Sequence, residues 1–249
     1  MRLLCLDIGN SRIKAAIFNN GAYESGITFS LEDDIRIIRI TFEQWIHDKN
    51  IKHIGVSNVK YKENERLSFF TDFTECVIWE IHHRMRLPFK MLYKTPETLG
   101  TDRICAIAGA YRSYPNQPLL VVDVGTAITY DFLNELNEYV GGAITPGMYL
   151  KFKALHQYTA KLPLITFNEN FPFIGQSTEE SIRTGVQTST IAEIEGMIAR
   201  YQAISSVPLK IILTGGDATF ISNYLTCEHL VDPHLVLKGI DFLVRYALY

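Results

Sequence analysis

The sequence predicts an α/β fold built from two related halves with a cleft between them, and two observations support this prediction. First, the segments Leu3–Ser11 and Leu119–Ala127, 116 positions apart, share one pattern: a short apolar run, Asp-x-Gly and a polar residue. Such apolar runs are typical of buried strands. Second, both halves continue with strands that alternate with helices. We therefore expect a duplicated domain, with one copy in residues 1–116 and the other in residues 117–249.

The first Asp-x-Gly bend joins a strand to a strand. Residues 12–18 alternate in side-chain character and run into Asn19–Gly21, a turn signal, so the bend forms the corner of a hairpin. A third strand is expected over residues 22–29. The chain contains neither G-x-x-x-x-G-K-[ST] nor G-x-G-x-x-G, so the two commonest nucleotide-binding folds have no support.

The remainder of the first half alternates helical and extended patterns. A helix capped by Thr41 is expected over Thr41–Asn50, with Glu43 in its first turn. The other expected elements are strands at His53–Val59 and Val77–Ile81, a helix at Glu63–Phe73, a loop over Leu87–Gly100 and a helix over Asp102–Tyr114. The proline-containing segment Tyr114–Pro118 is the best candidate boundary between the halves.

The second half repeats this plan. Its expected elements are hairpin strands at Leu119–Asp123 and Ile128–Leu133, a segment Val140–Gly147 leading into a helix that ends near Ala160, a strand at Lys210–Leu213 and a closing helix over Leu235–Ala247. Ser177 and Glu180 form a capping-box pattern that opens a long helix. The apolar positions of that helix, Ile191, Ile194, Ile198 and Tyr201, lie on one face, as in a core helix or a dimer surface.

Hairpin strands followed by alternating helices and strands, present twice around a hinge, indicate the actin-like (ribonuclease H-like) architecture of actin, Hsp70 and the sugar kinases. The glycine of each bend permits positive φ and a close approach of the backbone, so that successive N–H groups can converge on an anion. The adjacent aspartate can hold a cation. Two such bends, one in each half, are suited to hold a metal–nucleotide triphosphate from both sides.

The composition excludes several classes of function. The formal net charge is −3 and the densest basic patch, Arg84–Arg86, is short, which argues against nucleic acid as a partner. No apolar run is long enough for a membrane span, and the N-terminal one is too short for a signal peptide. The four cysteines are scattered, as is typical of reduced thiols, and Cys105 is expected in the core. The histidines show no zinc-ligand spacing. We predict a soluble cytoplasmic protein.

A resemblance to one family is carried by six motifs that occur in order along the chain. They are Asp7-Ile8-Gly9-Asn10-Ser11, Tyr93, Gly100-Thr101-Asp102-Arg103, Asp123-Val124-Gly125-Thr126-Ala127, Gly141-Gly142-Ala143-Ile144-Thr145-Pro146-Gly147 and Gly175-Gln176-Ser177-Thr178. The set resembles type III pantothenate kinase over almost the whole chain. This resemblance implies ATP-dependent phosphorylation of the primary hydroxyl of pantothenate, the first step of coenzyme A biosynthesis. It also implies a homodimer that uses Mg²⁺ and a monovalent cation, K⁺ or NH₄⁺.

The resemblance implies roles for individual residues as well. ATP would be bound by Asp7, Ile8, Gly9, Asn10, Ser11, Arg12, Ile13 and Lys14 in the first phosphate loop, and by Thr126 in the second. Pantothenate would be bound by Tyr93, Gly100, Thr101, Asp102, Arg103 and Thr178, with Asp102 as the general base. Asp123 would hold the monovalent cation, and Asp7 would lie near Mg²⁺. The chain departs from the family pattern at Ser11, where Thr is usual, and at Ser177, where Asn is common.

The acidic residues also have a structural interpretation. A single Asp-x-Gly is often a capped turn, because both residues are common in turns, but two copies in register favour a functional role. Asp102 begins an expected helix, where a carboxylate caps free N–H groups. The adjacent Arg103 favours a site for a small anion, since a guanidinium binds a carboxylate through two parallel hydrogen bonds.

Other candidate residues remain open between two interpretations. Thr178 is either a substrate contact or part of the capping box with Ser177. The glycine-rich segments Gly141–Gly147 and Thr214–Asp217 are either anion-binding and adenosine-binding loops or plain turns. Lys14 either reaches a phosphate or is a solvated strand lysine.

Three functions follow from these patterns. The first is an ATP-dependent pantothenate kinase. The second is another actin-like-fold kinase that acts on a sugar or a short carboxylic acid, but a sugar kinase does not need the guanidinium of Arg103. The third is an inactive ATP-binding regulator, or a filament-forming actin relative, which would keep both bends and could lose Asp102.

Overall fold

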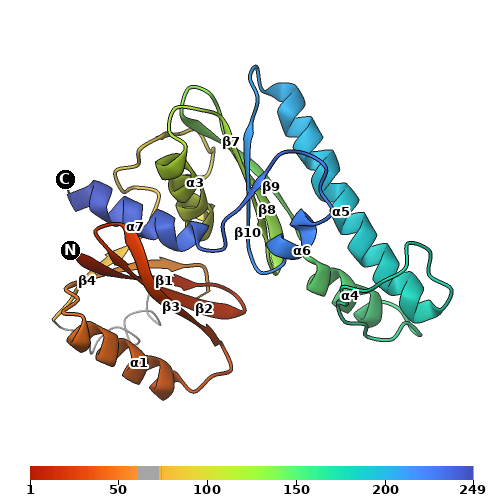
Figure 1. The fold of residues 1–249 in the computed structure, drawn as a ribbon, viewed down its shortest axis with the longest axis horizontal. Coiled ribbons are helices and arrows are strands. Elements are labelled where there is room, and N and C mark those ends of the chain that lie inside the picture. Colours follow the sequence, from red (N-terminus) through yellow and green to blue (C-terminus); the bar gives the residue numbers. More distant parts are fainter. Residues whose placement is uncertain (61–72, 74, 249) are drawn as a thin grey trace. The chain divides into compact units, whose positions relative to one another are not determined.

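The structure is a computed structural model that describes residues 1–60, 73 and 75–248 (Figure 1). It separates into two compact units. Unit 1 consists of Met1–Pro115 together with the segment from His234 onward, and unit 2 consists of Asn116–Pro233. The helix expected at Glu63–Phe73 falls outside the described residues, apart from Phe73. The chain passes from unit 1 to unit 2 between Pro115 and Asn116, within the boundary segment expected at Tyr114–Pro118. The C-terminal segment, however, belongs to unit 1 and not to the second half.

Unit 1 contains a five-stranded sheet. The strands are β1 (Arg2–Ile8), β2 (Arg12–Asn19), β3 (Ala22–Ser30), β4 (His53–Asn58) and β5 (Val77–Glu80), in the order β3-β2-β1-β4-β5. The central strand β1 is antiparallel to β2 and parallel to β4. Three helices, α1 (Ile35–Asp48), α3 (Thr101–Ser113) and α7 (Leu235–Leu248), accompany the sheet, and the segment before α3 holds the short β6 (Lys90–Met91) and a 3₁₀ turn, η1 (Pro96–Thr98).

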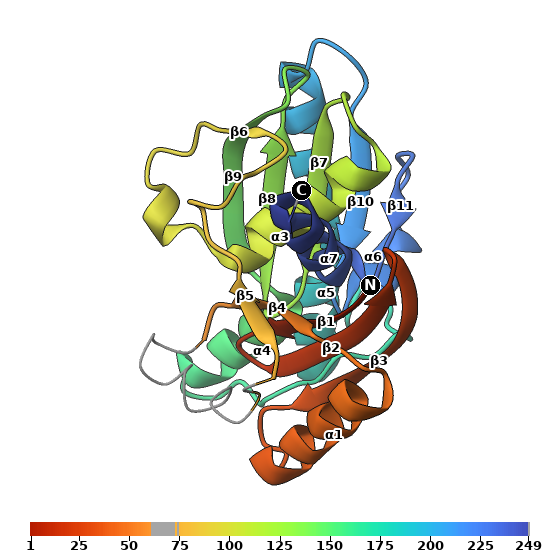
Figure 2. The same cartoon turned by 90° about the vertical axis from the view of Figure 1, so that its left-hand side faces the viewer.

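Helices cover both faces of this sheet (Figures 1 and 2). On one face, Phe42 of α1 packs in a core cluster with Leu4 and Leu6 of β1. On the other face, Ile240 of α7 lies so close to Gly55 of β4 that a larger residue than glycine would collide with it. Successive side chains of a strand point to opposite faces, so the continuous apolar run of β1 is buried on both sides.

The C-terminal helix α7 belongs to unit 1 because its buried acid is paired there. Asp241 is completely buried and accepts hydrogen bonds from Nη1 of Arg112 on α3 (2.9 Å) and from Nε of Arg245 (2.8 Å). Arg112 also donates to the carbonyl of Gly21 in the β2–β3 turn (2.8 Å). The expectation that the closing helix is part of the second domain was therefore wrong, since order along the chain does not determine which sheet a helix covers.

Unit 2 repeats the topology of unit 1. Its strands are β7 (Leu119–Val124), β8 (Ala127–Leu133), β9 (Glu138–Pro146), β10 (Lys210–Thr214) and β11 (Leu230–Val231), which lie in the order β11-β10-β7-β8-β9. The central β7 is antiparallel to β8 and parallel to β10, as β1 is to β2 and β4. Its helices are α4 (Met148–Gln157), α5 (Thr178–Ile204) and the short α6 (Ala218–Ser222). The predicted duplication of an actin-like α/β domain is confirmed by this shared strand order.

The long helix α5 forms as expected. Ser177 Oγ accepts a hydrogen bond from the N–H of Glu180 (3.2 Å), and Glu180 accepts one from the N–H of Gln176 (2.8 Å). Ile194 and Ile198 are buried in the core of unit 2, so this face of α5 is a core face.

Several boundaries differ from the expected ones. Helix α1 begins six residues earlier than predicted, because the side chain of Asp34 caps it by accepting from the N–H of Arg36 (2.9 Å). Thr41 lies inside that helix and donates to the carbonyl of Ile37 (2.9 Å). The segment before α4 is the strand β9, α4 ends at Gln157, and α6 and β11 were not predicted. None of the helices in the described part of the chain has the length and apolar character that crossing a bilayer requires.

Candidate active site

The first Asp-x-Gly bend lies at the carboxyl end of β1, where the sheet changes from antiparallel to parallel pairing. Asp7 is buried and lies opposite Lys14 of β2 on one side and Ser57 of β4 on the other. The N–H of Gly9 donates to the carbonyl of Arg12 (3.0 Å) and closes the bend. In α/β sheets, ligands bind beyond the carboxyl ends of strands at such a change in topology.

The second bend occupies the equivalent position in unit 2. Asp123 of β7 lies opposite Thr129 of β8 and Thr214 of β10. The N–H of Gly125 donates to the carbonyl of Ala127 (3.0 Å), as Gly9 does to Arg12. The two segments that resemble each other in sequence are therefore structural copies.

The glycines of the two Asp-x-Gly bends do not adopt the positive φ that was expected for them. Neither Gly9 nor Gly125 has a positive φ, and a Cβ on Gly9 would lie at an ordinary 3.4 Å from the carbonyl of Arg12. Next to the second bend, strict requirements for glycine lie at Gly215 and Gly147. Gly215 has a φ of +98°, and a Cβ there would overlap the carbonyl of Val124; a Cβ on Gly147 would overlap the carbonyl of Gly125.

Two further loops border the bend of unit 2. The N–H of Gly147 donates to the carbonyl of Thr126 (3.0 Å), and the N–H of Asp217 donates to the carbonyl of Val124 (3.0 Å). Gly147, at the end of the Gly141–Gly147 segment, and the Thr214–Asp217 segment are therefore packed against the Gly125–Thr126 bend. The sequence signals for these segments were the pair Gly141-Gly142, which lies within β9, and the pair Gly215-Gly216, which follows β10, although the residues were not included among the expected ligands.

In unit 1, the start of α3 lies beside the first bend. Thr101 Oγ1 accepts a hydrogen bond from the N–H of Asn58 (3.0 Å) and lies 3.0 Å from Ser57 Oγ. Since Ser57 is opposite Asp7 in the sheet, these bonds hold the first turn of α3 next to the Asp-x-Gly bend.

Asp102 lies in this first turn and is partly buried. The N-cap position belongs to Gly100, while Asp102 Oδ1 accepts from the N–H of Arg103 (2.8 Å). Burial raises the pKa of Asp102 above its ordinary value, against the opposing effect of that N–H and of the Arg103 charge. Gly100 leaves room for the carboxylate, since a Cβ there would overlap Asp102 Oδ1.

Asp7 and Asp102 lie in the same part of unit 1. Burial raises the pKa of the Cys105 thiol well above its usual range, and the charges of Asp7 and Asp102 raise it further. Two carboxylates therefore act on one buried thiol from the end of β1 and the start of α3. The prediction that Cys105 is a core thiol is confirmed.

Arg103 and Tyr93 are also brought together. The Arg103 side chain is buried, and its guanidinium carbon lies 5.8 Å from the centre of the Tyr93 ring. A guanidinium over an aromatic face is held in place by a cation–π interaction and keeps its in-plane N–H groups for anions.

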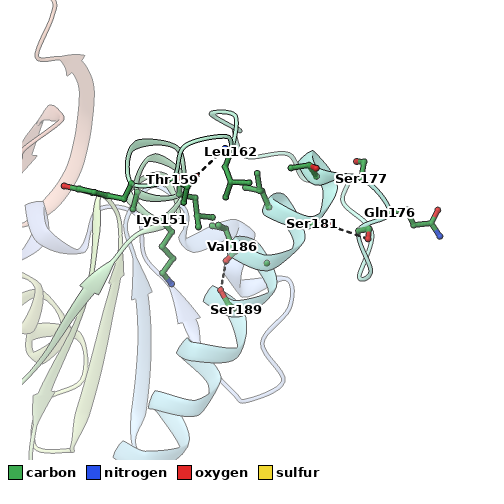
Figure 3. A pocket seen from close by; sticks show the side chains of 15 residues that line it. Lys151, Thr159, Leu162, Gln176, Ser177, Ser181, Val186 and Ser189 are labelled. Carbon is green, nitrogen blue, oxygen red and sulfur yellow. Dashed lines mark hydrogen bonds between the residues drawn. The ribbon is translucent and has the colours of Figure 1, made fainter.

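Thr178 lies in unit 2, at the start of α5. It borders a groove of about 1060 Å³ between α4 and α5, lined by apolar side chains that include Leu155, Ile182 and Val186 (Figure 3). Ser177 supplies the cap of α5, so the hydroxyl of Thr178 is not needed for the capping box. Unit 2 thus carries Asp123, Thr126 and Thr178, and unit 1 carries the other candidate residues.

Comparisons with known proteins give one family. The family described as type III pantothenate kinase matches residues 3–200. A type III pantothenate kinase from Flavobacterium johnsoniae is 35% identical over 246 residues, covering 99% of this chain and 98% of the relative. One from Phocaeicola vulgatus is 37% identical over 248 residues, covering 98% of each chain.

Solved structures agree on the fold. The activator of 2-hydroxyisocaproyl-CoA dehydratase from Clostridium difficile, solved with bound ADPNP, has a TM-score of 0.58 at 16% identity and covers 99% of this chain and 94% of its own. The ROK hexokinase from Thermus thermophilus has a TM-score of 0.53 at 12% identity, with 98% of each chain covered. At these identities the likeness shows the fold alone.

The duplicated sheet, with an Asp-x-Gly bend in each unit, defines a protein of the actin-like α/β class. The chain belongs to the type III pantothenate kinase family. Its activity is the phosphorylation of pantothenate, with ATP as the phosphoryl donor and a divalent metal ion, as kinases of this family require. Neither another acceptor nor an inactive regulator is needed to explain the sequence.

Proposed function

We propose that Asp102 is the general base, which accepts the proton of the primary hydroxyl of pantothenate at the first step of coenzyme A biosynthesis. The observation that carries this proposal is the position of Asp102 in the first turn of α3, which the bonds of Thr101 to Ser57 and Asn58 hold beside the Asp7 bend. Burial raises its pKa. A base is most effective when its pKa approaches the working pH, so this shift favours the role.

Arg103 is the proposed partner of the pantothenate carboxylate. Its guanidinium is buried over the Tyr93 ring, which restricts its orientation. A carboxylate that accepts two parallel N–H bonds from a guanidinium is held in a defined plane. The substrate would then be bound by the residue next to the base. Such binding holds the hydroxyl in place, so that its reaction becomes effectively intramolecular.

Asp7 is the proposed protein ligand for Mg²⁺, and the ATP phosphates would lie on the Asp7–Lys14 bend and on Thr126. Mg²⁺ prefers hard oxygen ligands and is usually held by one or two carboxylates together with phosphates. A buried carboxylate at the edge of an exposed bend fits that requirement. When bound, the ion would neutralise charge on the transferring phosphoryl group.

Asp123 is the proposed ligand of the monovalent cation, K⁺ or NH₄⁺. Its carboxylate is partly buried at the end of β7, and Oδ1 faces the Gly215 turn, where the absence of a side chain leaves space beside it. Thr126 follows in the same bend. This arrangement would couple the cation to the position of the second phosphate loop.

The proposed assembly is a homodimer, and we expect it in the cytoplasm, where its four free cysteines stay reduced. Unit 2 exposes large apolar side chains next to the α4–α5 groove: Tyr158 is 81% exposed, Phe173 79% and Ile174 74%. Exposed apolar patches mark interaction surfaces, and a second copy of the chain is the proposed occupant. Sedimentation of the native enzyme and of a Phe173→Ser variant tests it, and a monomeric native enzyme would contradict it.

The central experiment is turnover by the Asp102→Asn variant. Asparagine can still accept from the N–H of Arg103, so the fold is kept, while the base is lost. We expect kcat to fall by roughly 10²–10⁴-fold with little change in KM. Glu97→Gln, an exposed acid in the segment just before α3, is the matched control and should retain native turnover. Near-native kcat in Asp102→Asn would leave Asp102 with a structural role only.

A second assay separates the cation proposal from the base. Native enzyme is assayed with ATP and pantothenate in potassium and in tetramethylammonium buffer of equal ionic strength. We expect activity to depend on potassium, and Asp123→Asn to lose that dependence. Equal rates of the native enzyme in both buffers would reject the cation site and would have no bearing on the role of Asp102.

A further inference from the structure

A partly buried polar cluster in unit 2 lies outside every role described above. Glu193 of α5 is its centre. Lys151 Nζ donates to Glu193 Oε2 (2.6 Å), and Thr145 Oγ1 and the Tyr130 hydroxyl both donate to Oε1. Lys151 Nζ also donates to Thr190 Oγ1 on α5 (2.9 Å). This group, the Glu193 cluster, joins β8, β9, α4 and α5.

The pair at its centre is partly shielded from water. The side chain of Lys151 is 19% exposed and that of Glu193 26%. Lys151 extends from α4 towards α5 at the inner end of the groove, near Ser189 (Figure 3). Burial opposes ionisation of Glu193, but the hydrogen bonds from Lys151 and Thr145 outweigh it and hold the pKa of Glu193 below its usual value. The cluster is therefore an ion pair with its acceptors satisfied.

The contacts of the cluster lead to the second phosphate loop. Thr145 is two residues before Gly147, whose N–H donates to the carbonyl of Thr126 (3.0 Å). Gly147 is packed so tightly on the carbonyl of Gly125 that no side chain fits. Lys151 is in the first turn of α4, and its N–H donates to the carbonyl of Gly147 (3.0 Å). Glu193 thus holds the chain on both sides of the residue that supports the bend.

We propose that Glu193 is a positioning residue for the Gly125–Thr126 bend, which it fixes through Thr145 and Lys151 on either side of Gly147. The inference rests on the proposed contact between Thr126 and ATP. A buried ion pair adds little net stability over apolar residues of the same size, so stability alone is a weak reason to place one here. Fixing the geometry of a phosphate loop explains the ion pair better, since small displacements of a binding group reduce the rate of catalysis strongly.

The test separates positioning from stability with a paired replacement. In Lys151→Met/Glu193→Met, both charges are removed and the space stays filled, so the Tm should stay within a few degrees of native. Thr145 and Tyr130 then both lose their acceptor on Glu193. We expect the KM for ATP to rise about tenfold or more while the KM for pantothenate changes less than twofold. Glu193→Gln, which keeps shape and one acceptor oxygen, should give a smaller rise with the same ATP selectivity.

Glu195→Gln is the matched control. Glu195 lies on the same helix but accepts from Thr226 (3.2 Å), so its loss should leave the KM for ATP unchanged. A native KM for ATP in the double variant, or equal rises in both KM values together with a large fall in Tm, would overturn the inference.

Thr126→Val distinguishes this inference from the proposed function on which it rests. If the KM for ATP is native in Thr126→Val, the assignment of Thr126 itself fails. If it rises in Thr126→Val but not in the double variant, the role of Glu193 alone fails.

Discussion

Gly215 provides the sharpest test of how unit 2 supports its Asp-x-Gly bend. Its φ is +98°, and an added Cβ would lie 2.5 Å from Asp123 Oδ1 and overlap the carbonyl of Val124. An L-residue in the left-handed region costs about 1–2 kcal/mol. Overpacking of a closely packed site adds about 1–3 kcal/mol. The structure therefore predicts that Gly215→Ala destabilises unit 2 by about 2–5 kcal/mol.

Calorimetry and steady-state kinetics measure the two consequences. For a chain of this size, that loss lowers Tm by about 4–20 °C. The KM for ATP should rise at least about tenfold, because the loop can relieve the overlap only by displacing Asp123 or Val124, and tenfold corresponds to about 1.4 kcal/mol.

The adjacent Gly216 supplies the control for Gly215→Ala. Its φ is not positive, and a Cβ there would meet no atom within 4 Å. Gly216→Ala should change stability by less than about 0.5 kcal/mol, the usual range for a surface substitution. Equal Tm and equal KM for ATP in the two alanine variants would refute the argument from backbone conformation and close packing.

Two further predictions concern Asp102 and Asp241. Because burial raises the pKa of Asp102, kcat/KM should fall as the pH is lowered, with an inflection above the ordinary pKa of an aspartate. This acidic limb should be absent in Asp102→Asn. An unchanged limb in the variant would assign the inflection to another group. The same raised pKa lowers stability as the pH rises, because burial disfavours the ionised carboxylate in the folded state. Asp102→Asn should therefore keep or raise the Tm at neutral pH, and the difference from the native enzyme should shrink as the pH falls. Asp241→Asn breaks a buried network whose arginines are 33% and 19% exposed. The usual loss of about 3–5 kcal/mol for a broken buried pair is reduced by this exposure to about 2–4 kcal/mol. Denaturant unfolding measures it against Glu228→Gln, an exposed pair partner worth about 0–1 kcal/mol, and equal midpoints would contradict the prediction.

Local patterns predicted much of the fold. The apolar runs before Asp7 and Asp123 become the central strands β1 and β7, because a continuous apolar run is compatible only with burial on both faces. The capping box at Ser177 places the start of α5 correctly, since the cap involves residues that are neighbours along the chain. The predicted cap at Thr41 was wrong, because the side chain of Asp34 caps α1, which begins six residues before the predicted start of that helix.

The candidate site was predicted as a set of residues and not as a geometry. The motif around Asp102 contained its partners Gly100 and Arg103, and the sequence alone left open whether Asp102 caps α3. In the structure, the cap position is Gly100. Asp102 is placed beside the first bend because the adjacent Thr101 hydroxyl is hydrogen-bonded to Ser57 and to the N–H of Asn58 on a distant strand. Bonds between residues about 43 positions apart have no local signature.

The sequence by itself determined the duplication, the two bends and the family, because all three depend on residue types at fixed spacing. Tertiary structure alone decided which glycines are indispensable, which unit receives α7 and how Glu193 is connected to the Gly125–Thr126 bend. These properties depend on which backbone carbonyl, arginine or lysine another part of the chain brings within about 3 Å, the range in which hydrogen bonds and steric overlap act.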